Sequence, residues 1–310
     1  EIGLSLVGSE MCIRDSMENL MGQRRTNRNV FGLRNRFRRG WRITKLGIHV
    51  VKADPELIIY VLFSAIMSIL SFGLILTFTG GIGFVFGNDE GLESGAAVGT
   101  FVSYFVVSII TVFWNAAIVA SAYERLTTGR NPSFFYGINQ AMKCLPQIFA
   151  WGLVSGTVGV IIGFFEGMAS SDNIIVAIIG RIIAELIRFA WWMTTFFVVP
   201  MIVLEKSGVF ESMEKSPKLF AKTWGENIVA SAGTGIINFI VILTIIVVCL
   251  PLFVFGEIGA ALAFILIVIG IAISSLFFTA CDAVNKASMY YYAKTGEEVP
   301  LAQKYGLDTY

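Results

Sequence analysis

The most prominent pattern in the sequence is a series of long apolar runs. A bilayer core of about 30 Å needs roughly 20 residues of α-helix to cross it. Five runs of this length contain no Lys, Arg or His, and a sixth, residues 174–204, contains Arg181, Glu185 and Arg188. The pattern therefore predicts an all-α, polytopic membrane helix bundle with six transmembrane helices. The five uncharged runs are residues 57–79, 96–123, 145–165, 228–255 and 258–281.

The charges between these runs alternate in sign along the chain. Lys and Arg occur before the first run, in the second and fourth connections, and after the last run. In the first, third and fifth connections every charged residue is acidic. Because cytoplasmic loops of membrane proteins carry the excess of positive charge, this alternation predicts a multi-pass protein of the cytoplasmic membrane with both termini cytoplasmic. The acidic residues are Asp89, Glu90, Glu93, Glu166, Asp172 and Glu257.

The segment before the first run has the pattern of an amphipathic helix. Its apolar positions recur at spacings of three and four residues, with arginines elsewhere on the helix. We expect an interfacial helix at the inner leaflet, with Trp41 at headgroup depth and Arg38, Arg39 and Arg42 toward anionic membrane lipids. Positive-inside topology alone would also explain these charges. The apolar positions are Leu33, Phe37, Trp41, Thr44, Ile48 and Val51.

These features divide the chain into four parts. Residues 1–16 include LVGSEMCIRDS, which resembles the translation of one reading frame of a widely used transposase sequencing adapter, so we expect Met17 to be the true start. Residues 17–56 form the basic cytoplasmic arm, residues 57–285 the six-helix transmembrane domain, and residues 286–310 the cytoplasmic tail. Lead-in segments similar to the arm precede the third and fifth runs, which suggests three successive units of a lead-in segment and a hairpin.

Three charged residues within the run at residues 174–204 form the main candidate site. Arg181, Glu185 and Arg188 share one helix face, so Glu185 can pair with both arginines. Charges inside the hydrocarbon region are costly and often functional, which favours an anion site, a gate or a substrate path. The run is also long enough to place the cluster at the outer membrane boundary as a self-neutralised structural group. Both interpretations stay open.

Two amides and a row of glycines are the other candidates within the runs. Asn115 and Asn238 are predicted polar residues of the bundle interior, and hydrogen bonding between helices is their expected role. The glycines favour close packing of a neighbouring helix over a flexible hinge. They are Gly152, Gly156, Gly159 and Gly163.

Composition excludes most catalytic chemistry. The chain is 55% hydrophobic and only 15% charged, whereas soluble domains carry about a quarter charged residues. His49 is the single histidine, the four cysteines form no CxxC pair, and HExxH is absent. We therefore expect no enzyme, no catalytic residue, no metal and no cofactor, and we expect no nucleic-acid partner.

Three short motifs carry a resemblance to a known family. They are Trp41 with Lys45 ahead of the sequence DPEL at 54–57, FFVVP at 196–200, and KTWGE at 222–226. Together they resemble a family of prokaryotic six-helix membrane proteins known only as a domain of unknown function. The resemblance would cover nearly all of residues 17–298. It supports the topology and implies no catalytic residues.

Two functions are consistent with these patterns. The first is a transporter or channel-like protein for a small solute, an ion or a lipid. The alternative is a membrane scaffold or assembly partner, in which the glycines and the basic arm serve only protein and lipid contacts. A polar cavity that joins the charged cluster to Asn115 or Asn238 would favour transport, and a position of the cluster at the lipid edge would favour the scaffold.

Overall fold

The computed structural model describes residues 36–170 and 173–305, without the side chains of residues 83–94 and 303. The described chain is built from helices, which confirms the predicted all-α class. Four of its segments are long and apolar enough to cross a membrane: Glu56–Ile82, Gly95–Thr128, Leu145–Ala169 and Trp224–Thr295. The predicted adapter-derived segment and Leu33 lie outside the described residues.

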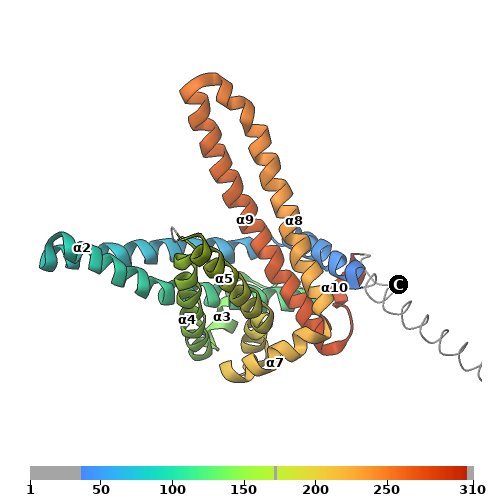
Figure 1. Ribbon diagram of the computed structural model, residues 1–310. Coiled ribbons are helices and arrows are strands. Elements are labelled where there is room, and N and C mark those ends of the chain that lie inside the picture. The colour runs from blue at the N-terminus through green and yellow to red at the C-terminus, as the bar shows by residue number, and fades with distance from the viewer. Residues whose placement is uncertain (1–35, 171–172, 306–310) are drawn as a thin grey trace, which may run out of the picture.

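The described helices form hairpins that diverge from a shared base (Figure 1). The hairpin of α2 and that of α8 and α9 point in different directions, and α4 lies beside α2 with α5 against it (Figure 1). The last candidate segment therefore contains two antiparallel helices. The hairpins are α2 (Glu56–Thr128), which reverses between residues 82 and 95; α4 (Leu145–Ala169) with α5 (Ile174–Thr195); and α8 (Trp224–Cys249), η2 (Leu250–Phe255) and α9 (Gly256–Thr295).

A shorter lead-in helix precedes each hairpin, as the sequence suggested. A break of one or two residues separates the lead-in helix from the hairpin in each case. Pro55 lies at the first break and Pro146 in the first turn of α4, where a missing N–H costs no helical hydrogen bond. The lead-in helices are residues 36–53, α3 (Phe134–Met142) and α7 (Val209–Lys222).

The N-terminal lead-in helix packs closely against α8 and α9. A Cβ added to Gly40 would lie 2.9 Å from the backbone oxygen of Glu226 in α8, and one added to Gly47 would lie 3.1 Å from that of Cys281 in α9. The Thr44 hydroxyl donates to the Ala230 carbonyl at 3.1 Å. The helix is therefore held by protein contacts along its glycine face.

This docking divides the predicted apolar face of that helix. Thr44 and Val51 are buried against protein, whereas Phe37 is 59% and Trp41 36% exposed. An apolar stripe has the same spacing whether it faces lipid or another helix, because both environments remove it from water. Only the N-terminal end of the described stripe is available to lipid.

The hydrophobic core lies at the base, where the hairpins meet. It joins the N-terminal helix, both arms of α2, the start of α4, the inner part of α9 and α10 (Pro300–Lys304). The outer arms are covered only by their own hairpin partner, and large apolar side chains there are exposed. Leu74 and Phe78 of α2 are each 70% exposed, and Ile258 of α9 is 78% exposed. Apolar patches of this extent are rare on proteins in water, and these surfaces are compatible with a membrane protein.

The chain leaves α5 through an irregular segment. α5 ends at Thr195, a short helix α6 (Val198–Pro200) follows, and a π-helical turn η1 (Met201–Glu205) ends the segment. The backbone N–H of Phe197 donates to the Ser216 hydroxyl of α7 at 3.1 Å. A side chain of α7 thus satisfies a backbone group that the break in the helix leaves without a helical partner.

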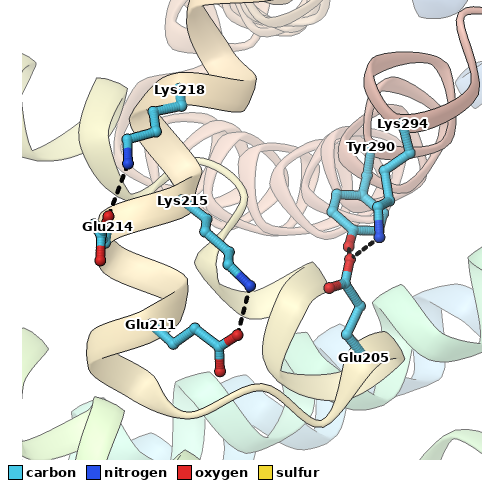
Figure 2. A network of polar contacts seen from close by, with 7 residues as sticks. All are labelled: Glu205, Glu211, Glu214, Lys215, Lys218, Tyr290 and Lys294. Carbon is cyan, nitrogen blue, oxygen red and sulfur yellow. Dashed lines mark hydrogen bonds and ion pairs between the residues drawn. The ribbon is translucent and has the colours of Figure 1, made fainter.

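α9 continues beyond the predicted transmembrane domain into residues 286–295, the first part of the predicted tail. Met289 and Tyr290 are buried there. Figure 2 shows Glu205, at the end of η1, facing α9, where it accepts hydrogen bonds from Tyr290 and Lys294. Nearby, α7 pairs its own charges at i and i+4 in Glu211–Lys215 and Glu214–Lys218 (Figure 2). This region belongs to the base of the fold.

Candidate functional site

Two pockets meet inside the base. The larger, about 210 Å³, lies among the second arm of α2, α4, α5 and α6. The smaller, about 90 Å³, lies between the two arms of α2 and the inner part of α9. Thr111, Asn115 and Lys286 line both pockets. These three side chains form a polar partition in a mostly apolar protein, and we call them the partition below.

Aromatic rings line the larger pocket. Trp151 of α4 stacks on Trp191 of α5 with ring centroids 5.4 Å apart. Trp192 and Phe196 pack edge to face, with their ring centroids 5.5 Å apart. The break after α5 brings Phe196 to the pocket wall. The larger pocket therefore offers ring faces and edges to a ligand, beside the polar side chains of Ser155 and Thr195.

The smaller pocket differs from the larger in containing an acidic side chain. Tyr60, Ser64 and Thr279 line it together with Asp282, which does not line the larger pocket. The Tyr60 hydroxyl donates to the Phe134 carbonyl at 2.6 Å, which fixes the ring between α2 and α3. Since one water occupies about 30 Å³ of liquid, this pocket is large enough for a few water molecules.

Lys286 is the charged member of the partition. Its ammonium lies 2.8 Å from the Asp282 carboxylate one helical turn earlier in α9. It also lies 5.8 Å from the centroid of the Phe196 ring, within the range of a cation–π interaction. An ammonium has three donors, so the Asp282 contact leaves capacity for a ligand.

Sequence reasoning missed Asp282 and Lys286. It placed Lys286 in the tail, because a cation after a long apolar run usually marks the membrane boundary. A signal was present nonetheless: no Gly or Pro occurs between Cys281 and Thr295, so the sequence contains nothing that would end the helix.

The two candidate asparagines lie in different places. Asn115 is half-buried in the partition. Asn238 of α8 accepts a hydrogen bond from the Ser274 hydroxyl of α9 at 2.6 Å and lines neither pocket. Asn238 thus connects two helices of one hairpin, and Asn115 faces the pockets.

The charged cluster of α5 lies on the surface of the α4–α5 hairpin. Arg188 pairs with Glu185 at 2.6 Å and with Glu166 of α4. The side chains of Arg188, Glu185 and Glu166 are 44%, 63% and 53% exposed, and none lines either pocket. Within the described residues, Arg181 is exposed and makes no ion pair with Glu185. The structure therefore separates this cluster from the partition.

The glycine row of α4 faces the second arm of α2. A Cβ added to Gly152 would lie 2.8 Å from the Cα of Ile109, and one on Gly156 would lie 3.3 Å from the Cα of Phe105. Gly159 and Gly163 face the Tyr104 ring and hydroxyl at 3.6 and 3.5 Å. Close helix approach thus depends on the inner two glycines.

The predicted lipid-contact residues have different surroundings. Arg38 is exposed, and Trp41 packs beside Gly233 of α8 with part of its ring exposed. Arg39 pairs with the buried Glu226 at 3.4 Å and contacts the Tyr292 hydroxyl. The Arg42 guanidinium donates to the Arg38 carbonyl at 3.3 Å. Arg39 thus ties the N-terminal helix to α8 and α9.

The buried Asp54, at the break between the N-terminal lead-in helix and α2, links this helix to the connection between α2 and α3. In the amide orientation that its surroundings require, the Asn131 nitrogen donates to both oxygens of Asp54. Burial raises the pKa of Asp54, and the nearby Arg125 guanidinium opposes this shift. No group of three or more His, Cys, Asp or Glu side chains in the described part of the chain could hold a metal ion.

Comparison with models of known protein families identifies the family of this chain. The model of a family of unknown function, DUF6159, matches residues 94–299. The chain belongs to DUF6159. The predicted resemblance to a family of unknown function is thereby confirmed, and no curated protein matches the chain. The DUF6159 match contains every residue that lines the larger pocket but excludes the N-terminal helix and Tyr60.

Proposed function

We propose that this DUF6159 member is a six-span protein of the cytoplasmic membrane that handles a small solute, as a transporter or channel-like protein does. The observation that carries the proposal is the partition of Thr111, Asn115 and Lys286 between two pockets. Polar and ionisable groups within helices that span membranes are costly and concentrate along substrate and ion paths. Concave pockets with a few convergent polar groups are also the usual form of small-molecule sites.

The distribution of charge supports the proposed orientation. The N-terminal lead-in helix and α7 carry basic residues, and Arg125, Arg130 and Lys143 flank α3, whereas the turns of the hairpins are acidic or uncharged. In the proposed orientation the lead-in helices, α10 and both termini face the cytoplasm, and the tips of the hairpins face outside. Both pockets then lie toward the cytoplasmic half of the protein, near the base.

Anionic lipids of the inner leaflet are the proposed partners of the N-terminal helix. Phe37, Arg38, Trp41 and Lys45 form its exposed face, which combines aromatic anchors with positive charge. Arg39 and Arg42 contribute to the positive potential, with Arg39 also bound to Glu226. We propose no catalytic role, because the pockets contain no nucleophile with an adjacent base.

The scaffold is the second candidate, and one observation favours it. The charged cluster of α5 is exposed and paired across one hairpin, as expected of a structural group at a membrane boundary. A scaffold would need no accessible pocket around Asn115. The two functions therefore differ in whether water-soluble molecules reach the partition.

Thiol labelling in membrane vesicles tests this difference. A background without Cys12, Cys144, Cys249 and Cys281 would carry Asn115→Cys, and a membrane-impermeant maleimide would be added to inside-out and right-side-out vesicles. Labelling from either face supports a solute path. The matched control is Ser274→Cys, since Ser274 is buried and lines neither pocket. Asn115→Cys that stays as unreactive as the control in folded protein would contradict the proposal and favour the scaffold.

A further inference from the structure

Lys286 is the single charged side chain that lines the larger pocket. The Asp282 carboxylate with which it pairs lines only the smaller pocket. The two pockets therefore differ in electrostatic character: the smaller contains a neutralised pair, and the larger presents a cation to an aromatic wall. Since an unpaired charge that is partly removed from water is unfavourable, Asp282 serves as the counter-ion of Lys286 while the larger pocket holds no ligand.

We propose that the larger pocket binds a small organic anion with an apolar body. This rests on the proposed solute-handling function and specifies its ligand class. The carboxylate or similar group of the ligand pairs with Lys286, and its apolar body packs against the rings of Trp151, Trp191 and Phe196. A hydrogen bond to a charged partner is stronger than a neutral one, so the charge of the ligand governs selectivity more than the shape of its body.

The volume limits the size of the ligand. An apolar cavity of about 150 Å³ binds benzene. The larger pocket, of about 210 Å³, therefore accommodates one aromatic ring or a short alkyl chain together with a carboxylate. The Asn115 amide, which also lines the pocket, offers N–H donors to the second carboxylate oxygen.

The Asp282 carboxylate competes with the ligand for the same ammonium. Lys286 and Asp282 are 24% and 33% exposed, so neither is sealed from water and their pair can rearrange. A bound anion shares Lys286 with Asp282, and repulsion between the two carboxylates weakens binding. Removing the charge of Asp282 therefore strengthens anion binding, and removing the charge of Lys286 abolishes it. These opposite signs distinguish an anion site from a structural ion pair.

The test uses full-length protein in lipid nanodiscs and three small probes. Benzoate and hexanoate are anions with a ring and a chain, and benzyl alcohol is a neutral analogue of the first. Tryptophan fluorescence reports binding, because three tryptophans line the pocket, and sodium chloride at equal ionic strength corrects for salt. We expect wild-type protein to bind benzoate at least tenfold more tightly than benzyl alcohol.

Variants sharpen the test. Lys286→Gln is expected to lose the tenfold preference for benzoate, and Asp282→Asn to increase benzoate affinity several-fold. Lys294→Gln is the matched control, because Lys294 also lies on α9 in an ion pair but lines neither pocket, and it should keep wild-type affinity. If Lys286→Gln fails to fold, Lys286→Arg should retain the preference for benzoate over benzyl alcohol. Asp282→Asn still tests the inference, because it should raise the affinity for benzoate.

Two results would overturn the inference. In the first, neither anion binds wild-type protein more tightly than benzyl alcohol. In the second, Asp282→Asn weakens benzoate binding as Lys286→Gln does, which indicates that the pair only supports the fold. Labelling of Asn115→Cys alongside either result would leave the solute-handling function standing with a different ligand class. Loss of labelling with anion binding intact would instead indicate a ligand-regulated scaffold.

Discussion

The two halves of α9 lie in one continuous helix but have opposite surroundings. In the outer half, large side chains point away from protein: Ile258, Phe264 and Ile273 are 78%, 67% and 63% exposed. In the inner half, Cys281, Ala287 and Met289 have no exposed surface. Lipid covers the first in the proposed topology, and the N-terminal helix, α2 and α6 cover the second.

The difference in composition between the halves shows what each environment requires. The outer half contains Ile, Leu, Val and Phe, which suit lipid on every face. The inner half buries alanines together with Asn285 and Ser288. Small residues allow close helix approach, and polar residues form hydrogen bonds between helices, as Asn285 does with Thr234 at 2.8 Å. In this chain, loss of hydrophobicity along a helix marks entry into protein.

The strongest test of this comparison is a pair of truncations in α9. Met289→Ala removes a buried side chain and should lower the free energy of unfolding by about 2–5 kcal/mol. Leu266→Ala, in the outer half, removes a side chain that is 49% exposed and should cost less than half as much. Chemical unfolding in mixed micelles measures both. Equal losses would indicate that a protein surface covers the outer half as well.

A second pair applies the comparison to glycines. Gly152→Ala places a Cβ 2.5 Å from Ile109 Cγ1, so α2 and α4 must separate and the free energy of unfolding should fall by about 1–3 kcal/mol. Gly73→Ala, in the outer arm of α2, meets no atom within 4 Å. Its higher helix propensity should raise stability by about 0.5–1 kcal/mol. Opposite shifts in thermal melting support the assignment, and a stabilised Gly152→Ala contradicts it.

The charged cluster of α5 predicts a smaller effect. Glu185→Gln removes one partner of an exposed ion pair, and exposed ion pairs contribute little to the free energy of unfolding. Arg188 keeps its second partner, Glu166. We expect melting in detergent to change by no more than such a pair contributes. A loss comparable to that of Met289→Ala would mean that the cluster is buried, for example against a second copy of the chain.

The smallest effect concerns Asp54, at the base. Its raised pKa means that the folded state binds a proton more readily than the unfolded state. Stability attributable to Asp54 therefore increases as pH falls from above the folded-state pKa toward 3.8, the ordinary value. Asp54→Asn lacks this titration, so wild-type protein should gain stability relative to the variant on acidification. A difference in melting temperature that is constant with pH would refute the assignment.

The sequence predicted the helices better than their contacts. Apolar runs identify the helices of the hairpins, because both lipid and a protein core require apolar side chains. Asn115 could be identified as a polar residue within such a run. Lys286 and Asp282 were missed because a cation that follows an apolar run looks the same in the sequence whether the run ends at a membrane boundary or continues into the protein core at the base of the fold. The pairing of Arg188 with Glu166 depends on the register of two helices, which no local pattern encodes. Gly40 and Gly47, on one helix face, were an unused signal that the N-terminal helix docks on protein.

The position of α9 at the base has a consequence for synthesis of the protein. In the proposed topology the two ends of each hairpin lie on the same side of the membrane, and the turns that cross the bilayer are short and free of basic residues. Each pair of helices can therefore leave the translocon as a unit before the next is made. Residues 278–293 emerge from the ribosome after both earlier hairpins, yet they contact the N-terminal helix and α2. In the proposed topology the earlier hairpins therefore wait in the membrane without the inner part of α9, and premature termination before residue 278 would leave them unassembled.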